Sequence, residues 1–376
     1  MGIGRIGIVG GGQLGKMLTI AAKKMGYYVV VSDPTPQSPA GQVADLQIIA
    51  DYKDDSAINK LADQSDVLTF EIELANSLVL KDLKKAGKVI HPSPSTLEII
   101  QDKLKQKKYL KKHRVKTAEF IEVTNKSDVV KAAKVFGYPL VLKARTDAYD
   151  GRGNVSIKRD KDIDMALKKL EGRGLYVEKY VPFVLELAVM VAKSTKGKIV
   201  LYPIVQTIHE NHVCDTVITP AKISKEALRN AQALARRTVR HLSGAGVFGV
   251  EMFLTKDDNI LVNEIAPRVH NSGHYTIEAC VTSQFEQHIR AVMGLPLGST
   301  KMISKAAVMK NILGRREGDG KPLGIEKALK IDGVSLHMYG KVGSKVGRKM
   351  GHITVVGDSV SECLRKANKA RRVLNI

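Results

Sequence analysis

The chain has 376 residues, of which 44% are hydrophobic, so it can form two or three domains with a sizeable core. Its formal net charge of +22 indicates affinity for phosphorylated ligands, nucleic acid or acidic partners. No apolar run approaches the roughly 18 residues of a membrane span, and the N-terminus lacks a secretory signal pattern. The cysteines, Cys214, Cys280 and Cys363, are widely spaced and odd in number, which indicates a reducing compartment. We therefore expect a cytoplasmic globular protein with no membrane contact.

The first hundred residues alternate short apolar strands with helices. Residues 5–9 form a strand, the glycine-rich turn Gly10–Gly15 opens a helix to about Met25, and a second strand ends at Asp33. This βαβ pattern predicts a small doubly wound α/β domain over residues 1–95. The turn could hold the pyrophosphate of NAD, another phosphate or a ribose, or it could be only a tight strand–helix connection.

A strongly basic segment follows. We expect one long helix, capped by Ser95 and running to about His113. The densest block, Lys103 to Lys116, has eight lysine or arginine residues in fourteen positions and is either an anion-binding face or a solvated helix face. The chain has no tryptophan and only seven phenylalanines, so platforms for stacking on single strands are not evident. No specific nucleic-acid partner is expected.

Residues 135–157 are rich in strand-forming residues around a glycine loop. Lys143 ends a strand, and the loop Asp150–Asn154 begins seven residues later. Glycines let backbone N–H groups approach oxygen atoms, and cations offset the charge of those oxygens. The pattern is typical of a polyphosphate site or of a basic hairpin turn.

The next apolar strand, Tyr176–Pro182, runs into a bend. Glu186 lies eight residues after Glu178. Backbone groups of such a strand can pair with an adenine, and a carboxylate can accept hydrogen bonds from ribose hydroxyls. Two surface glutamates are the alternative interpretation.

Two further apolar runs flank the polar turn Lys256–Asn259 and predict a β-hairpin. If the turn is centred between its second and third residues, Glu251 and Glu264 become direct cross-strand neighbours, with Cβ atoms about 5 Å apart. Opposed like charges destabilise a hairpin unless a cation lies between them, and hard oxygen ligands suit Mg²⁺. The alternatives are two exposed acids on an edge hairpin, or a one-residue shift of the turn that breaks the pairing.

The polar segment Asn263–His274 continues from this hairpin. It holds a carboxylate, a guanidinium, two imidazoles, two carboxamides and a hydroxyl, with few apolar side chains. A segment of this composition is either solvated surface or a site, and the hairpin before it favours a site.

The remaining elements are amphipathic helices over 225–242 and 275–293, short strands after about residue 300, and a last helix near 359–373. Lys341 and Arg348 flank a glycine-containing basic loop. This loop suits a monoester phosphate, or it is a solvated hairpin turn.

Together these motifs resemble the ATP-grasp family and, within it, the 5-(carboxyamino)imidazole ribonucleotide synthases of purine biosynthesis. The combination of Arg268–His274 with Gly347–His352 is the most specific part of the resemblance. The other matching segments are Gly10–Gly15, Thr69–Glu73, Gln101–Lys103, Tyr149–Gly153, Val177–Lys179 and Thr282–His288.

The resemblance implies an ATP-grasp fold, α/β and α+β, in several parts. The implied parts are an N-terminal doubly wound parallel α/β domain (1–95), a linker helix with the small lobe (96–190), a large lobe with the metal site (191–300) and a small C-terminal β-rich subdomain (301–376).

The implied activity is that of an ATP-dependent carbon–nitrogen ligase. ATP phosphorylates bicarbonate to carboxyphosphate, which delivers CO2 to the exocyclic amine of 5-aminoimidazole ribonucleotide, and ADP and phosphate are released. Mg²⁺ or Mn²⁺ is the implied metal, and the family is usually homodimeric. The rival hypotheses are a formate-using ATP-grasp ligase of purine metabolism, a nicotinamide-dependent oxidoreductase built on the glycine-rich turn, and a nucleic-acid-binding protein.

The resemblance also assigns roles by position. Arg268 and His270 lie where carboxyphosphate forms and protons move. The residues assigned to ATP are Lys103, Lys143, Glu178, Lys179, Tyr180, Val181, Glu186, His209 and Asn263. The metal ligands are Glu251 and Glu264. The residues assigned to the ribonucleotide are Gln13, Leu14, Glu73, Tyr149, Asp150 and Arg152, with Lys341 and Arg348 for its phosphate.

The chain departs from the family pattern at a few positions, none of which removes a proposed catalytic group. Thr146-Asp147-Ala148 stands where the family has Thr-Gly-Gly, Thr207 replaces an asparagine, Leu187 a serine and Lys345 an arginine. Asn263 would point away from Glu264 in a regular strand, so its role requires a bend.

Overall fold

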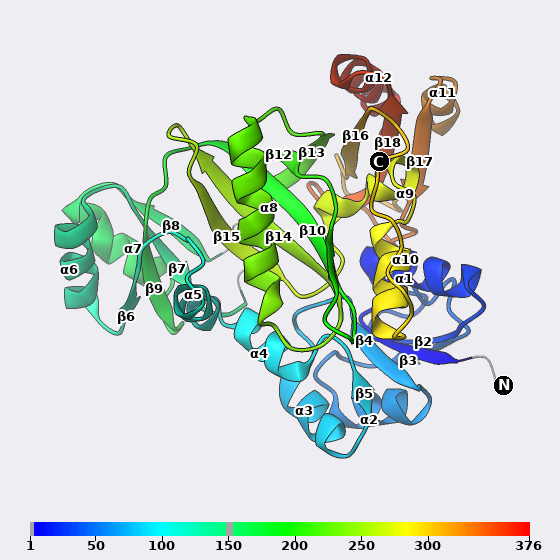
Figure 1. Cartoon of the computed structure of the whole chain (residues 1–376), viewed down its shortest axis with the longest axis horizontal. Coiled ribbons are helices and arrows are strands. Elements are labelled where there is room, and N and C mark those ends of the chain that lie inside the picture. The colour runs from blue at the N-terminus through cyan, green and yellow to red at the C-terminus, as the bar shows by residue number, and fades with distance from the viewer. Residues whose placement is uncertain (1–3, 148–152) are drawn as a thin grey trace.

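The computed structural model describes residues 4–147 and 153–376. Within these ranges the backbone forms three sheets, of five, four and nine strands, that are surrounded by helices (Figure 1). No helix among the described residues is long and apolar enough to cross a membrane.

The N-terminal sheet is fully parallel, with the strand order β3-β2-β1-β4-β5. Its apolar strands are buried, as the sequence predicts for a sheet covered by helices. The fold prediction for this domain is confirmed. Its elements are β1 Arg5–Val9, α1 Gln13–Lys24, β2 Tyr28–Asp33, β3 Leu46–Ile49, α2 Asp55–Asp63, β4 Val67–Phe70, α3 Ser77–Lys85 and β5 Val89–Ile90.

A second sheet, ordered β6-β9-β7-β8, forms a small lobe at one end of the molecule (Figure 1). The expected strand-rich segment begins later than residue 135, because Val135 belongs to helix α6, which ends where Gly137 takes a φ of 73°. The elements of the lobe are β6 Phe120–Val123, α6 Lys126–Phe136, β7 Leu140–Ala144, β8 Asn154–Ile157, η1 Asp160–Asp162, α7 Ile163–Lys169 and β9 Leu175–Lys179.

The third sheet runs through the large lobe and on into the C-terminal part of the chain. Its order is β15-β14-β10-β12-β13-β16-β18-β17, and β11 pairs with β10. Because β13 pairs with β16, the C-terminal strands extend the sheet of the large lobe. The strands are β10 Phe183–Lys193, β11 Ile199–Leu201, β12 Val205–Glu210, β13 Val213–Thr219, β14 Gly246–Thr255, β15 Ile260–Ala266, β16 Ala306–Leu313, β17 Val334–Met338 and β18 Lys349–Gly357.

Helices pack against this long sheet in two places. Helix α8 contacts β10, β14 and β15, and α12 contacts β16 and β18. The helices of this part are α8 Lys225–Arg240, α9 Thr276–Ala279, α10 Gln284–Val292, α11 Ile325–Leu329 and α12 Val360–Val373, with the single turn η2 at Asn271–Gly273.

Two expected helices are each broken in the structure. The basic helix is divided at Asp102 into α4 (Pro94–Gln101) and α5 (Lys103–Lys112), because the Asp102 side chain caps α5. The helix expected over 275–293 is divided into α9 and α10, because Ser283 caps α10 through the backbone N–H of Glu286. At both places a capping side chain starts a new helix, although the apolar periodicity of the sequence continues across the break.

Candidate active site

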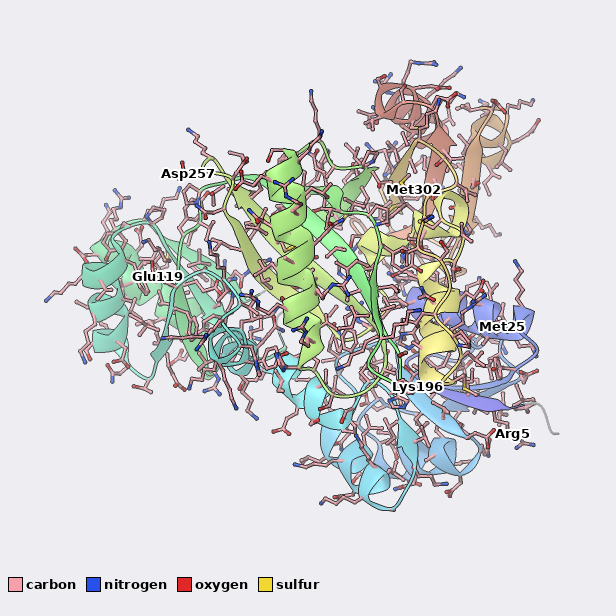
Figure 2. All side chains as sticks on the ribbon, in the orientation of Figure 1. Arg5, Met25, Glu119, Lys196, Asp257 and Met302 are labelled. Atoms are coloured by element: carbon pink, nitrogen blue, oxygen red, sulfur yellow. The ribbon has the colours of Figure 1, made fainter. Side chains whose placement is uncertain are left out.

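The hairpin β14–β15 brings Glu251 and Glu264 together as direct cross-strand partners, as predicted. The turn, however, is shifted by one residue, because Thr255 pairs with Asn259 and the turn is centred on Asp257, which lies at the tip in Figure 2. A β-bulge between this turn and the two glutamates restores the expected register. The bulge falls at Asn263 and supplies the bend that its proposed role requires.

The two glutamates differ in their partners. Glu264 forms an ion pair with the ammonium of Lys103 on α5, whereas Glu251 Oε1 lies 3.5 Å from His270 Nε2. Burial and then the charge of Glu264 raise the pKa of Glu251 to about 7. Burial would also raise the pKa of Glu264, but Lys103 lowers it to about 2.

This pair fits a divalent cation. Opposed carboxylates with one raised pKa need more positive charge than Lys103 supplies, and carboxylate oxygens are the ligands that Mg²⁺ prefers. Among the described residues, no group of three or more histidine, cysteine, aspartate or glutamate side chains could hold a metal ion. Two carboxylates can supply part of a coordination shell, and Mg²⁺ in nucleotide sites usually takes its other ligands from phosphate oxygens and water.

A second buried carboxylate, Glu178 on β9, lies between a lysine of α5 and a lysine of β7. Its two oxygens are each 2.9 Å from a lysine Nζ, one of Lys107 and one of Lys143. Burial alone would raise the pKa of Glu178, but the two lysines lower it to about 2. Lys107 also donates to the Thr117 hydroxyl and to the Asn263 carbonyl, so it ties this cluster to the metal hairpin.

The connection between the lobes follows β9 directly. Lys179 is the last residue of β9, and Tyr180 and Val181 lie between β9 and β10. The Lys179 ammonium lies 3.0 Å from Glu119 and Tyr180 is 43% exposed, so these residues line the lobe junction and not the core. A nucleotide between the lobes would meet this connection.

Glu186 and His209, which were assigned separately to the nucleotide, contact each other. They lie on the adjacent strands β10 and β12 and form a short side-chain hydrogen bond. Burial alone would lower the pKa of His209, but the bond with Glu186 raises it. This pair faces the same charge cluster, because the charge of Glu251 also contributes to the shift.

The segment after β15 carries Arg268 and His270. One terminal nitrogen of Arg268 lies 2.9 Å from Glu73, and its buried Nε has no hydrogen-bond partner among the described residues. Burial and then the charge of Arg268 lower the pKa of His270 to about 3, so its ring is neutral. Its Nδ1 accepts from the Ser272 N–H (3.4 Å) and lies 2.9 Å from the Ser272 hydroxyl oxygen, and its Nε2 faces Glu251.

The glycine-rich turn is occupied by carboxylates of the chain itself. Glu71 accepts hydrogen bonds from Gly12 (2.8 Å) and Gly15 (3.0 Å) at the start of α1, and Asp33 accepts one from Gly11 (2.8 Å). A pyrophosphate would need these same N–H groups, and an NAD ribose would need Asp33. This geometry argues against the nicotinamide interpretation.

The residues assigned to the ribonucleotide lie on three parts of the chain. Gln13 begins α1, Leu14 packs in the core, and Glu73 holds Arg268. The Lys341 ammonium lies 5.7 Å from the centre of the Tyr339 ring, and Arg348 donates to two carbonyls of its own loop. The assigned Tyr149, Asp150 and Arg152 lie outside the described residues.

The loop of Lys341 is tied to the N-terminal domain. Lys16 on α1 donates to the Tyr339 carbonyl (3.0 Å), and the Gln42 amide donates to the Gly340 carbonyl (2.7 Å). The start of α1 and the C-terminal basic loop are therefore neighbours, although more than 300 residues separate them.

Sequence reasoning missed four residues that shape the site: Lys107, Glu71, Gln284 and Asn311. Lys107 was one cation in a run of eight, and only its burial distinguishes it. Glu71 belonged to a matched motif, but the two glycine N–H groups that it binds are 56 and 59 residues away in the chain. The amides of Gln284 and Asn311 had no sequence pattern that could reveal their contacts.

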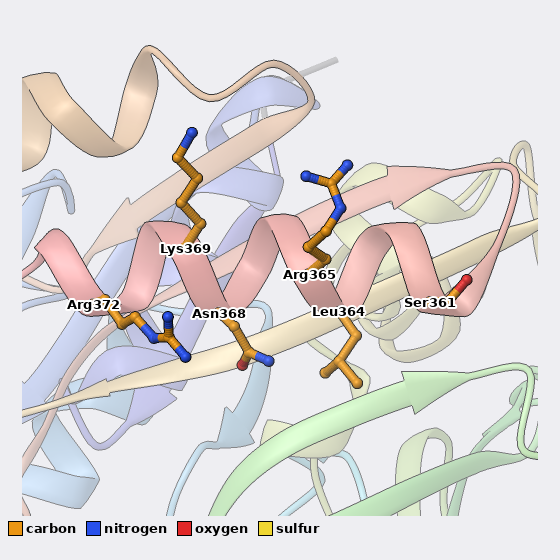
Figure 3. A pocket seen from close by; sticks show the side chains of 6 residues that line it. All are labelled: Ser361, Leu364, Arg365, Asn368, Lys369 and Arg372. Carbon is orange, nitrogen blue, oxygen red and sulfur yellow. The ribbon is translucent and has the colours of Figure 1, made fainter.

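A surface cavity of about 550 Å³ lies elsewhere, on helix α12 (Figure 3). Its lining residues are Ser361, Leu364, Arg365, Asn368, Lys369 and Arg372. None of them belongs to the charge cluster between the lobes, so this cavity is not part of the candidate active site.

A parallel α/β domain, a small antiparallel lobe, and a large lobe whose hairpin places two carboxylates beside Lys103 of α5 define an ATP-grasp enzyme. The family model of the ATP-grasp domain matches residues 108–285. The ribonucleotide synthetase preATP-grasp domain matches residues 3–101, and the phosphoribosylaminoimidazole carboxylase C-terminal domain matches residues 307–366. The chain belongs to the N5-carboxyaminoimidazole ribonucleotide synthase family.

Two curated relatives support this assignment. The N5-carboxyaminoimidazole ribonucleotide synthase of Bacillus subtilis is 42% identical over 362 residues, which are 96% of this chain and 93% of that protein. The phosphoribosylaminoimidazole carboxylase of Ogataea methanolica is 45% identical over 369 residues. The chain spans about two thirds of the length of such fungal relatives, 68% for this one and 64% for that of Candida glabrata.

Solved structures match the whole chain. N5-carboxyaminoimidazole ribonucleotide synthetase from Thermotoga maritima has a TM-score of 0.91 and 50% identity, and the match covers 99% of both chains. The synthase from Aspergillus clavatus in complex with ADP and 5-aminoimidazole ribonucleotide has a TM-score of 0.91 and 39% identity, covering 99% of this chain and 98% of that one. The predicted family and fold are confirmed.

Proposed function

We propose that the chain carboxylates 5-aminoimidazole ribonucleotide with bicarbonate and ATP, by way of carboxyphosphate, in purine biosynthesis. The observation that carries the proposal is the continuity of β15 and the loop after it. Within seven residues this segment presents Glu264 to Lys103 and His270 to Glu251. This continuity supports a single site for the nucleotide, the metal and the carboxylation groups, as an acyl-phosphate intermediate requires. The Aspergillus complex with ADP and the ribonucleotide supports both substrates.

ATP is expected between the lobes. Its phosphates would replace carboxylates as partners of Lys103 and Lys143, both of which are ion-paired in the structure. Adenine would lie along the lobe connection, with the ribose near Glu186 and His209. The assigned residues are Lys103, Lys143, Glu178, Lys179, Tyr180, Val181, Glu186, His209 and Asn263.

Glu251 and Glu264 would hold Mg²⁺ or Mn²⁺, with Asn263 beside them. When bound, the ion neutralises phosphate oxygens and polarises the bond to the transferred phosphoryl group. Its presence would also separate the two carboxylates electrostatically and allow Glu251 to ionise fully. The protein contributes the fixed geometry of the pair, which the bulge sets.

Arg268 and His270 would act on the carboxyl group that is transferred from bicarbonate. A bicarbonate oxygen attacks the γ-phosphorus, the bond to the β-phosphate oxygen breaks, and carboxyphosphate and ADP result. The free Arg268 Nε can donate to the oxygens on which charge builds, which lowers the barrier more than it strengthens substrate binding. Carboxyphosphate then releases CO2 and phosphate, the exocyclic amine forms a bond to the carbon, and one proton leaves. Neutral His270 is able to accept that proton or pass it to phosphate.

The ribonucleotide would occupy the junction of the N-terminal domain and the C-terminal basic loop. Lys341 and Arg348 suit its phosphate, since two cations beside flexible glycines match a dianionic monoester. Gln13, Leu14, Glu73, Tyr149, Asp150 and Arg152 complete the assignment. We also propose the division of the chain at residues 95, 190 and 300, a cytoplasmic location and a homodimer.

The decisive assay is ADP release with each substrate omitted in turn. We expect turnover only when both 5-aminoimidazole ribonucleotide and bicarbonate are present. Formate is the matched control, because it is a one-carbon carboxylate that a formate-using ligase would accept. Turnover with formate and none with bicarbonate would replace this proposal by the formate-using one.

A further inference from the structure

The segment that carries Arg268 and His270 has no regular secondary structure except the single turn η2, yet its chemistry needs a fixed position. We propose that Gln284 and Asn311 are positioning residues that hold this segment in its carboxylating geometry, so that the C-terminal strand β16 acts on the reaction from outside the site. This inference rests on the proposed role of His270. Among the described residues, neither amide hydrogen-bonds a side chain that is assigned to the substrates.

The side-chain amide of Gln284 hydrogen-bonds both backbone groups of His270. Its Oε1 accepts from the His270 N–H (3.0 Å), and its Nε2 donates to the His270 carbonyl (2.7 Å). The same Nε2 lies 3.3 Å from Nδ1 of the buried His274. Gln284 is fully buried at the first position of α10, so this amide replaces the sheet partner that His270 would have in a strand.

The side-chain amide of Asn311, in the C-terminal part of the chain, hydrogen-bonds the side chain of Asn271, the residue after His270. Asn311 Nδ2 donates to Asn271 Oδ1 (2.7 Å), and Asn271 Nδ2 donates to Asn311 Oδ1 (3.1 Å). Asn311 also donates to the Cys214 carbonyl (2.7 Å) on β13. Both asparagines are buried, and Asn311 belongs to β16, the strand through which the C-terminal part joins the large-lobe sheet.

The two amides hold adjacent residues and come from different elements, α10 and β16. Gln284 fixes the backbone N–H and carbonyl of His270, and Asn311 fixes the side chain of Asn271, so the segment is held on both sides of the His270 ring, whose Nε2 faces Glu251. Buried amides are costly unless every donor and acceptor is satisfied, so an apolar pair would be the simpler way to fill this space. The paired amides of Asn271 and Asn311 instead specify one orientation of the segment, because both hydrogen bonds form at only one relative position of the two side chains.

The test replaces Asn311 by leucine and, separately, Gln284 by methionine. Each variant removes the amide hydrogen bonds while keeping the side-chain volume similar. The readouts are ATP affinity, turnover, and the carboxylated ribonucleotide formed per ADP released. We expect ATP affinity to be unchanged, turnover to fall about tenfold, within the range that misplacement of reacting groups costs, and product per ADP to fall below one half, because mispositioned carboxyphosphate is lost to water. Thr354→Val on the neighbouring strand β18 is the control, since its buried hydroxyl has no partner among the described residues.

A double-mutant cycle with His270→Ala separates positioning from general damage. If Asn311 acts through His270, adding Asn311→Leu to His270→Ala lowers turnover less than twofold further. Equal losses in both backgrounds, or an unchanged product ratio in both single variants, would overturn the inference. If Asn311→Leu does not fold, Gln284→Met alone decides by the same readouts. Full turnover by His270→Ala would instead refute the proposed function of that residue, and it is measured with Gln284 and Asn311 intact.

Discussion

Two neighbouring carboxylate clusters, which Lys107 connects, carry opposite electrostatic designs. On the small-lobe side, Glu178 receives a lysine on each oxygen and has a pKa near 2. On the hairpin side, Glu251 faces Glu264 and has a pKa near 7, although Lys103 lies against its neighbour. The first cluster is neutralised by the protein itself, whereas the second is left short of positive charge.

The difference indicates which cluster is charge-balanced without a ligand and which one needs an added cation. Glu178, held by the buried Lys107 and the partly buried Lys143, is charge-balanced before a ligand binds, and it keeps Lys143 in place for phosphate. The two opposed carboxylates at the β-bulge lack positive charge, which a divalent cation would supply. The following predictions test this contrast, from the largest expected effect to the smallest.

Removal of one hairpin carboxylate should abolish turnover. Glu264→Gln loses a hard ligand and the charge that opposes Glu251, and we expect activity to fall about 1,000-fold, the upper end of the range for removing one preorganised electrostatic group. ADP release at saturating Mg²⁺, beside a melting curve, is the measurement. Activity within a few-fold of the parent enzyme would show that the pair does not hold the metal.

Removal of one lysine from the other cluster should act on stability. Lys107→Met leaves the buried Glu178 with one cation, and breaking such a pair costs about 3–5 kcal/mol. Chemical denaturation measures this cost. Lys105→Met is the matched control on the same helix, because its ion pair with Glu98 is exposed and is worth at most about 1 kcal/mol. Similar losses for the two variants would contradict the structural role of Lys107.

The two groups that follow the hairpin should act on chemistry alone. Arg268→Ala and His270→Ala should each lower carboxylation by about 100-fold, the scale of one oxyanion donor, while binding ATP nearly normally. Calorimetry with ATP and ribonucleotide-dependent ADP release are the two measurements. Loss of ATP affinity in both variants would place this segment in the nucleotide site instead.

The pH dependence of stability should have opposite signs in the two clusters. The folded pKa of Glu251 lies above its ordinary 4.5, so in metal-free protein its ionisation destabilises the fold as pH rises from about 4.5 to 7. Glu251→Gln should therefore raise the unfolding midpoint at pH 8 but not at pH 4.5. The folded pKa of Glu178 lies below 4.5, so Glu178→Gln should lose stability throughout this range, and its deficit should shrink only below pH 4.5. Parallel pH profiles of the two variants in a chelator would refute the contrast.

Exposed cations should contribute least. Arg365, Lys369 and Arg372 line the cavity of α12 and form no ion pair among the described residues (Figure 3). Replacing all three by glutamate should change turnover less than twofold while weakening any nucleic-acid binding. That binding should be non-specific and disappear near 0.2 M salt, because phosphate contacts release counterions. A sequence-preferring complex that survives this salt would revive the nucleic-acid hypothesis.

Much of the candidate site was predictable because its residues sit beside strands. Two apolar runs around a polar turn predicted the hairpin and therefore the pairing of Glu251 with Glu264. The prediction succeeded although the turn was shifted by one residue, because the bulge at Asn263 compensated. A sequence pattern shows how many residues a hairpin has, but not where an extra residue is absorbed.

By itself the sequence determined the parallel N-terminal domain, the family and the opposed carboxylates, because these follow from local periodicity and from motifs kept in order. Only the tertiary structure decided that Lys107 and not its seven neighbours is buried against Glu178, that Glu71 fills the glycine-rich turn, and that the amides of Gln284 and Asn311 hold His270. These contacts join segments that are distant in the chain, and which polar group lies opposite which depends on how the sheets and helices pack. Polar side chains carry no periodic mark of their partner, so their pairing is fixed only when burial removes water as the alternative.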